Sequence, residues 1–140
     1  MKLTKWIHLV IRSRRSQRAR GAAVVEFAVV LPLLLTILFG IIEYGWVFMV
    51  RQTLQTSARE GARIAILQTS EEPYTAAHIR IAEVMKPTGL TTWTATVDPV
   101  GVVMEVKVIV PYDDVSLMGG FFGTHAYDLG GACSMRKEGM

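Results

Sequence analysis

The pattern of apolar and polar positions divides this chain into unequal parts, and its most prominent feature is a long apolar stretch near the start. Residues 27–42 carry no charge, and only Glu26 and Glu43 interrupt the apolar run over residues 22–50. A helix of that length spans ~43 Å, whereas the hydrocarbon core of a membrane is ~30 Å thick. The pattern therefore predicts one transmembrane helix over residues 22–50. Pro32 lies inside it and predicts a bend or local unwinding.

The helical pattern continues beyond the apolar stretch to about residue 68. The small and apolar side chains that recur there every three or four residues, and are expected to be packed, are Val47, Val50, Leu54, Ser57, Ala58, Gly61 and Ala65. Charged side chains occupy the rest of the circumference. We therefore expect one continuous helix of about 45 residues. Its expected helix-packing positions are Pro32 and four small residues that permit close backbone approach: Ala58, Gly61, Ala62 and Ala65.

Two interpretations of residues 59–63 remain open. The segment is either a surface that packs against another subunit, or its small residues pack on the chain's own head while its charges face water. After Glu71-Glu72-Pro73, a second helix is expected over residues 74–86. Its inward side chains are predicted to be Ala76, Ile79, Ala82 and Met85.

From residue 91 the apolar period changes from helical to two, which is typical of strands. Trp93, Ala95 and Val97 alternate with threonines. The second alternating set is Val102, Met104, Val106, Val108 and Val110, between Val103, Glu105, Lys107 and Ile109. Asp98-Pro99-Val100-Gly101 is suited to a turn between them, so a β-hairpin is expected. A third strand is predicted over residues 126–136, with a bulge at Gly130-Gly131. The expected fold class is α+β, with a small antiparallel sheet of about three strands.

Charge is distributed unevenly along the chain and predicts its orientation in the membrane. Residues 1–20 hold seven Lys or Arg and no acid, which leaves eight basic against twelve acidic residues in the remainder. Such a leader stays in the cytoplasm, and Tyr44, Trp46 and Phe48 lie where an outer aromatic belt would. Residues 51–140 are therefore expected outside the inner (cytoplasmic) membrane. The predicted topology signal consists of Arg12, Arg14, Arg15, Arg18 and Arg20.

The residues that could carry chemistry give no pattern typical of an enzyme. His8, His78 and His125 lack metal-ligand spacing, and the single Cys133 permits no internal disulfide. The glycine-rich segment 118–123 lacks the Gly-Lys-Ser/Thr ending of a phosphate loop. Asp113 and Asp114 follow Pro-Tyr at a strand end and are interpreted as solvated rather than as a catalytic carboxylate pair. Because the basic charge belongs to the leader, it does not indicate nucleic-acid binding. We expect no catalytic residue, metal, cofactor, small-molecule substrate or nucleic-acid partner.

Several motifs occur together: GAAVVEFA at 21–28, LPLL at 31–34, FGIIEYG at 39–45 and AREGAR at 58–63. The head adds VIVPY at 108–112 and SMR at 134–136. In this combination the chain resembles the TadE-like pseudopilins of tight-adherence (Flp-type, type IVb-like) pilus systems, from about residue 20 onward. The resemblance implies a minor pilin or pseudopilin that takes part in pilus assembly or in a related secretion apparatus.

The resemblance further implies that a prepilin peptidase cuts between Gly21 and Ala22, which divides the chain into a leader at 1–21, a membrane helix at 22–50 and a head at 51–140. It gives Glu26 and Phe27 an assembly and register role. An ionised carboxylate near hydrocarbon costs ~2.5 to 3.5 kcal/mol unless it is paired, and the new α-amino group of Ala22 is one partner. The alternative is that Glu26 reaches the headgroups and pairs with an arginine of the leader.

The implied partners are the lipid bilayer, the prepilin peptidase, other pilins or pseudopilins and the assembly platform. Glu43 is interpreted as an interfacial carboxylate beside the aromatic belt, with contact to the platform or a neighbouring helix as the alternative. The main alternative for the whole chain is an uncleaved, single-pass envelope-binding protein. A membrane-tethered enzyme is a more distant one.

Overall fold

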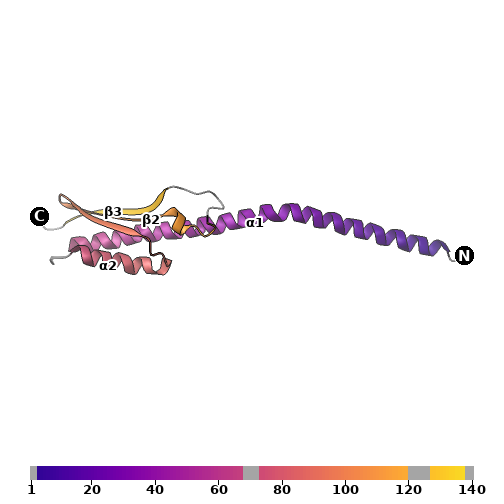
Figure 1. Cartoon of the computed structure of the whole chain (residues 1–140), viewed down its shortest axis with the longest axis horizontal. Helices are drawn as coiled ribbons and strands as arrows, with labels where there is room; N and C mark the ends of the chain where they lie inside the picture. The colour runs from indigo at the N-terminus through magenta and orange to yellow at the C-terminus, as the bar shows by residue number, and fades with distance from the viewer. Residues whose placement is uncertain (1–2, 68–72, 120–126, 138–140) are drawn as a thin grey trace. The chain divides into compact units, whose positions relative to one another are not determined.

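The computed structural model of the 140-residue chain describes residues 3–67, 73–119 and 127–137. Its elements in order are the helices α1 (Leu3–Leu67) and α2 (Pro73–Met85), the 3-10 turn η1 (Lys86–Thr88), the strands β1 (Thr94–Val100) and β2 (Val103–Pro111), the short helix α3 (Tyr112–Val115) and the strand β3 (Asp128–Arg136) (Figure 1). The chain divides into two compact units, Met1–Ile41 and Ile42–Met140. The α+β class predicted from the sequence is confirmed.

The first helix is longer than expected, since α1 comprises 65 residues and includes the leader. It remains helical through Pro32, so the predicted local unwinding is wrong; a bend stays a prediction. Proline lacks the N–H that would complete one helical hydrogen bond, but the helix continues because its other bonds are kept. Thr36 Oγ1 also donates a hydrogen bond to the Pro32 carbonyl oxygen at 2.8 Å.

The three strands form one antiparallel sheet in the order β1-β2-β3. Alternate side chains of β2 are buried at Met104, Val106, Val108 and Val110, whereas Glu105 and Lys107 are exposed. This is the period-two pattern that the sequence predicts for a strand with one face on a core. The sheet therefore presents one apolar face to α1 and α2, which lie along it in Figure 1.

The hairpin turn lies later in the chain than predicted. Asp98 and Pro99 belong to β1, where they pair with Glu105 and Met104, and the strands stay paired up to Val100 and Val103. Only two residues then remain for the turn, and the first of them, Gly101, has φ 63°. A two-residue hairpin of type II′ needs positive φ at that position, which glycine adopts without steric cost. Pro99 is tolerated because an edge strand has a side with no ladder hydrogen bonds.

No bulge is found at Gly130-Gly131, so that prediction is wrong. The register of β3 is one-to-one, with Gly130 opposite Ile109 and Gly131 opposite Val108. Gly131 instead lies directly against the backbone of Leu54 and Gln55 on α1, where a Cβ atom would collide. The missing side chain therefore serves the approach of a strand to a helix. Ala126, at the start of the predicted strand, lies outside the described residues.

The buried face of α1 in the second unit is the predicted one: Val50, Leu54, Ser57, Ala58, Gly61 and Ala65 are buried, with Ala62. For α2 the predicted face is largely wrong. Ile79 and Ala82 are exposed, whereas the residues buried are Ala77, Ile81 and Met85. Ile79 and Ile81 are equally apolar, so the sequence does not show which of them is buried. The position of α1 decides it, because Ile81 packs so closely on Gly61 that a Cβ atom there would lie 2.8 Å from its side chain.

Candidate functional site

The first candidate surface is the apolar part of the first unit. Among the described residues, one helical stretch, Gly21–Leu67, is long and apolar enough to cross a membrane, and its most apolar window is not buried at all within the chain. This stretch supports membrane anchoring. Its large exposed side chains in the first unit are Val24, Val25, Phe27, Val29, Val30, Leu33, Leu34, Leu35, Ile37, Leu38, Phe39 and Ile41.

The predicted cleavage and register residues lie at the start of that stretch. A Cβ atom at Gly21 would meet nothing within 4 Å, so this glycine is not needed for packing in the subunit. Ala22, Glu26 and Phe27 are exposed. Within the part of the chain whose side chains are described, Glu26 has no hydrogen-bond or ion-pair partner. The side chains of the five leader arginines lie outside that part, so pairing with them stays an open alternative.

Glu43 has a position that the sequence did not suggest. Its residue is 3% exposed, and its Oε2 accepts hydrogen bonds from the backbone N–H groups of Leu117 at 3.0 Å and Met118 at 3.2 Å. Two N–H donors on one carboxylate oxygen offset much of the cost of removing the charge from water. Neither interpretation made from the sequence described this role: Glu43 fastens a segment of the head to α1.

Trp46 makes a second attachment one helical turn further along α1. Its indole Nε1–H donates a hydrogen bond to the Val115 carbonyl oxygen at 2.9 Å. Residues three apart lie on the same face of a helix, so Glu43 and Trp46 together hold the segment 115–118. The signal in the sequence was this spacing of a carboxylate and an indole, but it does not identify the partner segment.

Two tyrosines from separate segments, Tyr112 and Tyr127, pack against each other next to the end of β2. The rings of Tyr112 and Tyr127 have centroids 5.0 Å apart, and the Tyr112 N–H donates to the Tyr127 carbonyl oxygen at 3.3 Å. Burial raises the pKa of the Tyr112 phenol, and nearby Tyr127, Glu43 and Tyr44 raise it further.

The helix-packing residues predicted on the outer half of α1 lie inside the head. Ala58, Gly61, Ala62 and Ala65 are buried in a core shared with α2 and the sheet. This arrangement corresponds to packing on the chain's own head, one of the two interpretations left open. Pro32 differs from them because it lies exposed in the other unit. Arg59 and Arg63 are exposed.

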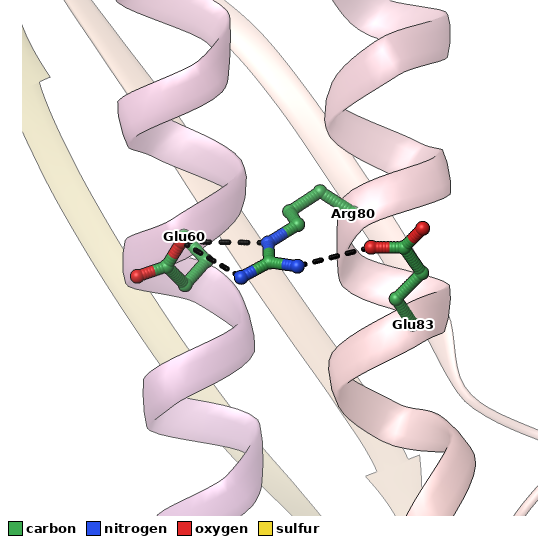
Figure 2. Close-up of polar contacts among 3 residues, drawn as sticks. All are labelled: Glu60, Arg80 and Glu83. Carbon is green, nitrogen blue, oxygen red and sulfur yellow. Dashed lines mark hydrogen bonds and ion pairs between the residues drawn. The ribbon is translucent and has the colours of Figure 1, made fainter.

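Glu60, between these small residues, links the two helices (Figure 2). Its Oε2 accepts from Arg80 Nε at 3.4 Å, and Arg80 Nη1 donates to Glu83 Oε2 at 3.0 Å. The hydrogen bond that Arg80 donates to Glu83 raises the pKa of the Arg80 guanidinium, burial lowers this pKa, and Glu60 raises it further. All three side chains are at least partly exposed, so this network orients α2 more than it stabilises the fold.

The residues weighed for catalysis are not brought together where the structure describes them. His78, Asp113 and Asp114 are exposed, and Cys133 is a half-buried free thiol. The described residues contain no group of three or more His, Cys, Asp or Glu side chains that could hold a metal ion. His125 lies outside the described ranges, as does the side chain of His8.

Comparison with protein families was informative for α1. Residues 21–63 match the family model described as TadE-like protein. This segment is TadE-like. The resemblance predicted from the sequence is thus confirmed over those residues, which include Glu26, Glu43 and the small residues up to Ala62. No match was found among curated proteins or solved structures. The TadE-like segment contains both the exposed apolar surface of the first unit and the part of α1 that packs on the sheet.

Proposed function

We propose that this chain is a minor pilin or pseudopilin that takes part in assembly of a tight-adherence (Flp-type) pilus or a related secretion apparatus. In this proposal a prepilin peptidase first removes residues 1–21. The observation that carries the proposal is that the TadE-like match begins at Gly21, the residue after which the motif predicts the cut. The proposed role is structural and requires no cofactor.

The exposed apolar stretch supports an assembly role. Nearly all side chains over residues 22–41 are exposed in the part of the chain that the structure describes, so they need lipid or other apolar helices around them. Lipid and neighbouring helices are similarly apolar, and therefore the hydrophobic effect alone does not select between them. A specific polar contact has to make the difference. Glu26, exposed and without a partner among the described side chains, is the residue we assign to it, paired with the α-amino group of Ala22 of a neighbouring subunit.

Removal of the leader has a physical consequence for extraction. A basic residue near an anionic cytoplasmic leaflet is held by about 1 kcal/mol, and the leader contains seven of them. While the leader is attached, moving the helix outward requires breaking these contacts. Cleavage removes them all in one step. The leader would thus keep the subunit at the inner membrane, with residues 1–21 in the cytoplasm and the head outside, until the peptidase acts.

The first experiment is the intact mass and N-terminal sequence of the protein purified from the membranes of its own cells. A chain that begins at Ala22 is expected. If Met1 and the complete leader remain in cells that contain active prepilin peptidase, the chain is an uncleaved, single-pass envelope protein and the proposal is wrong.

A matched pair of glycine variants makes the test specific. Gly21→Ala is expected to accumulate as the longer, unprocessed species, because the peptidase needs close access to the backbone at the cut. Gly45→Ala is the control, since a Cβ atom at Gly45 would also meet nothing within 4 Å. It is expected to be processed normally. Equal processing of both variants would contradict the assignment of the cut to Gly21.

A further inference from the structure

Three separate segments are joined to one another by Glu43, Trp46 and Tyr112 at one end of the second unit. The segments are residues 44–48 of α1, residues 117–118, whose N–H groups bind Glu43, and residue 127, which packs on Tyr112. Each segment contributes a large side chain left uncovered: Tyr44 is 65%, Phe48 64%, Leu117 54% and Tyr127 51% exposed. We call these four residues the collar.

The collar is held in place by contacts inside the subunit. Glu43 and Trp46 attach residues 115–118 to α1 through three hydrogen bonds, all between a side chain and the backbone. The Tyr112 ring packs against Tyr127, the residue before β3, three residues ahead of the Val115 carbonyl that Trp46 binds. A segment that was only tethered by the chain would not need these attachments. The four side chains therefore lie on segments that are joined to one another at one end of the second unit.

The chemistry of this surface fits a lipid–water interface. Tyrosine has an apolar ring and a polar hydroxyl, and it is enriched with tryptophan at the headgroup level of membranes. Tyr44 and Phe48 lie four residues apart on one face of α1, inside the C-terminal part of the span predicted over residues 22–50. Glu43, the carboxylate at this level, is buried and accepts hydrogen bonds from two backbone N–H groups, so contact between the collar and lipid does not expose its charge to hydrocarbon.

We propose that the collar docks on the lipid–water interface of the outward-facing leaflet, so that the head rests on the membrane through Leu117 and Tyr127 as well as through α1. This inference relies on the membrane-spanning part of the proposed function, but not on cleavage or pilus assembly. Its occupant is lipid. If the occupant were a neighbouring subunit instead, the collar of a subunit alone in a bilayer would be exposed to water.

The test uses the full chain, reconstituted at low density in vesicles of phosphatidylethanolamine and phosphatidylglycerol, with nitroxide labels on single cysteines. Cys133→Ser provides a background without cysteine, because Cys133 is the one cysteine of the chain. Labels are placed at Leu117→Cys in the collar and at Val100→Cys as the matched control. Val100 is also exposed and apolar, but it lies at the hairpin end of the sheet, the length of β2 away from Tyr112. Accessibility to oxygen and to a water-soluble nickel chelate is measured at each site.

We expect the ratio of oxygen to nickel accessibility to be several-fold higher at position 117 than at position 100. The inference is overturned if the label at 117 is as accessible to nickel as the label at 100, while a label at Phe48→Cys reports the membrane interface. In that case only α1 contacts lipid. A further label at Ile37→Cys separates the two proposals: if it reports water, the membrane span itself is wrong, and the proposed function fails with it.

Discussion

The two units of this chain treat similar side chains in opposite ways. In the unit that ends at Ile41, leucine, valine and phenylalanine side chains are exposed along a helix, whereas in the unit that begins at Ile42 one face of α1, which includes Val50 and Leu54, is buried by α2 and the sheet. The composition of α1 therefore does not reveal which of its apolar side chains are buried within the chain and which are exposed. The difference lies in whether a covering layer packs on α1, and in the second unit α2 and the sheet supply that layer.

The two glutamates of the apolar stretch show the same contrast. Glu26 is exposed and has no partner among the described side chains, whereas Glu43 is buried and accepts two backbone hydrogen bonds. From the sequence they look alike, since each is a single carboxylate between apolar residues. The structure separates a carboxylate that is available for another molecule from one that is already used within the subunit.

The largest difference between the two units is expected when one leucine in each is replaced by alanine. Leu54→Ala is expected to lower the free energy of unfolding of the head by about 2–5 kcal/mol, because it leaves a cavity in a closed core. Leu34→Ala removes the same atoms from an exposed position and is expected to leave that free energy unchanged. Urea titration of the full chain in detergent, followed by tryptophan fluorescence, measures both. Equal losses would show that the first unit also contributes to the core.

A pair of adjacent glycines tests how closely the sheet packs on α1. Gly131→Ala is expected to cost about 1–3 kcal/mol, because its Cβ atom would meet the backbone of Leu54, which cannot move aside easily. Gly130→Ala is expected to cost less, since the nearest atom is the Ile109 Cγ2 at 3.3 Å and belongs to a side chain. The same urea titration compares them. If Gly130→Ala is the more destabilising variant, β3 does not approach α1 as described.

Replacing each of the two glutamates by alanine tests the difference between the units at a single carboxylate. Glu43→Ala leaves the N–H groups of Leu117 and Met118 without their acceptor, which is expected to destabilise the head by about 1–3 kcal/mol. Hydrogen exchange at these two amides should become faster. Glu26→Ala is the control and is expected to leave the exchange of both amides unchanged. Faster exchange in Glu26→Ala would contradict the separation of the two carboxylates.

The smallest effect is expected at the ion pair between α1 and α2. Glu60→Gln weakens the contact with Arg80, which remains bonded to Glu83 and to water. Because the charges are partly exposed, the loss of stability should be small and should disappear as salt is added. Urea titrations at low and high ionic strength measure it. A large loss that persists at high salt would indicate that Glu60 supports the core rather than the orientation of α2.

Much of the fold could be predicted from the sequence because apolar periodicity reports local geometry directly. The apolar stretch, the buried face of α1 and the alternating face of β2 were all predicted in this way. The errors occurred where two local solutions were equally apolar or equally suited to a turn. On α2 both Ile79 and Ile81 were available, and at the hairpin both Asp98-Pro99 and Gly101 favoured a turn.

The Gly21–Glu26 part of the candidate site could be predicted from the sequence, whereas the contacts of Glu43 and Trp46 could not. The Gly21 and Glu26 spacing is a linear motif, and the TadE-like match covers it. The hydrogen bonds from Glu43 and Trp46 to residues 115–118 join positions that are 69, 74 and 75 residues apart in the sequence. No local pattern contains that pairing. It depends on where the sheet places the end of β2 relative to α1.

The sequence by itself determined that this chain has a long apolar helix with a basic leader and a small α+β head, because hydrophobic period and charge are properties of neighbouring residues. The tertiary structure alone decided which glutamate is buried, which isoleucine of α2 faces the core, and why β3 requires glycine at position 131. Each of these depends on a close approach between elements distant in the chain. Such approaches are selected by shape and by hydrogen-bond partners, which become defined only when the elements pack together.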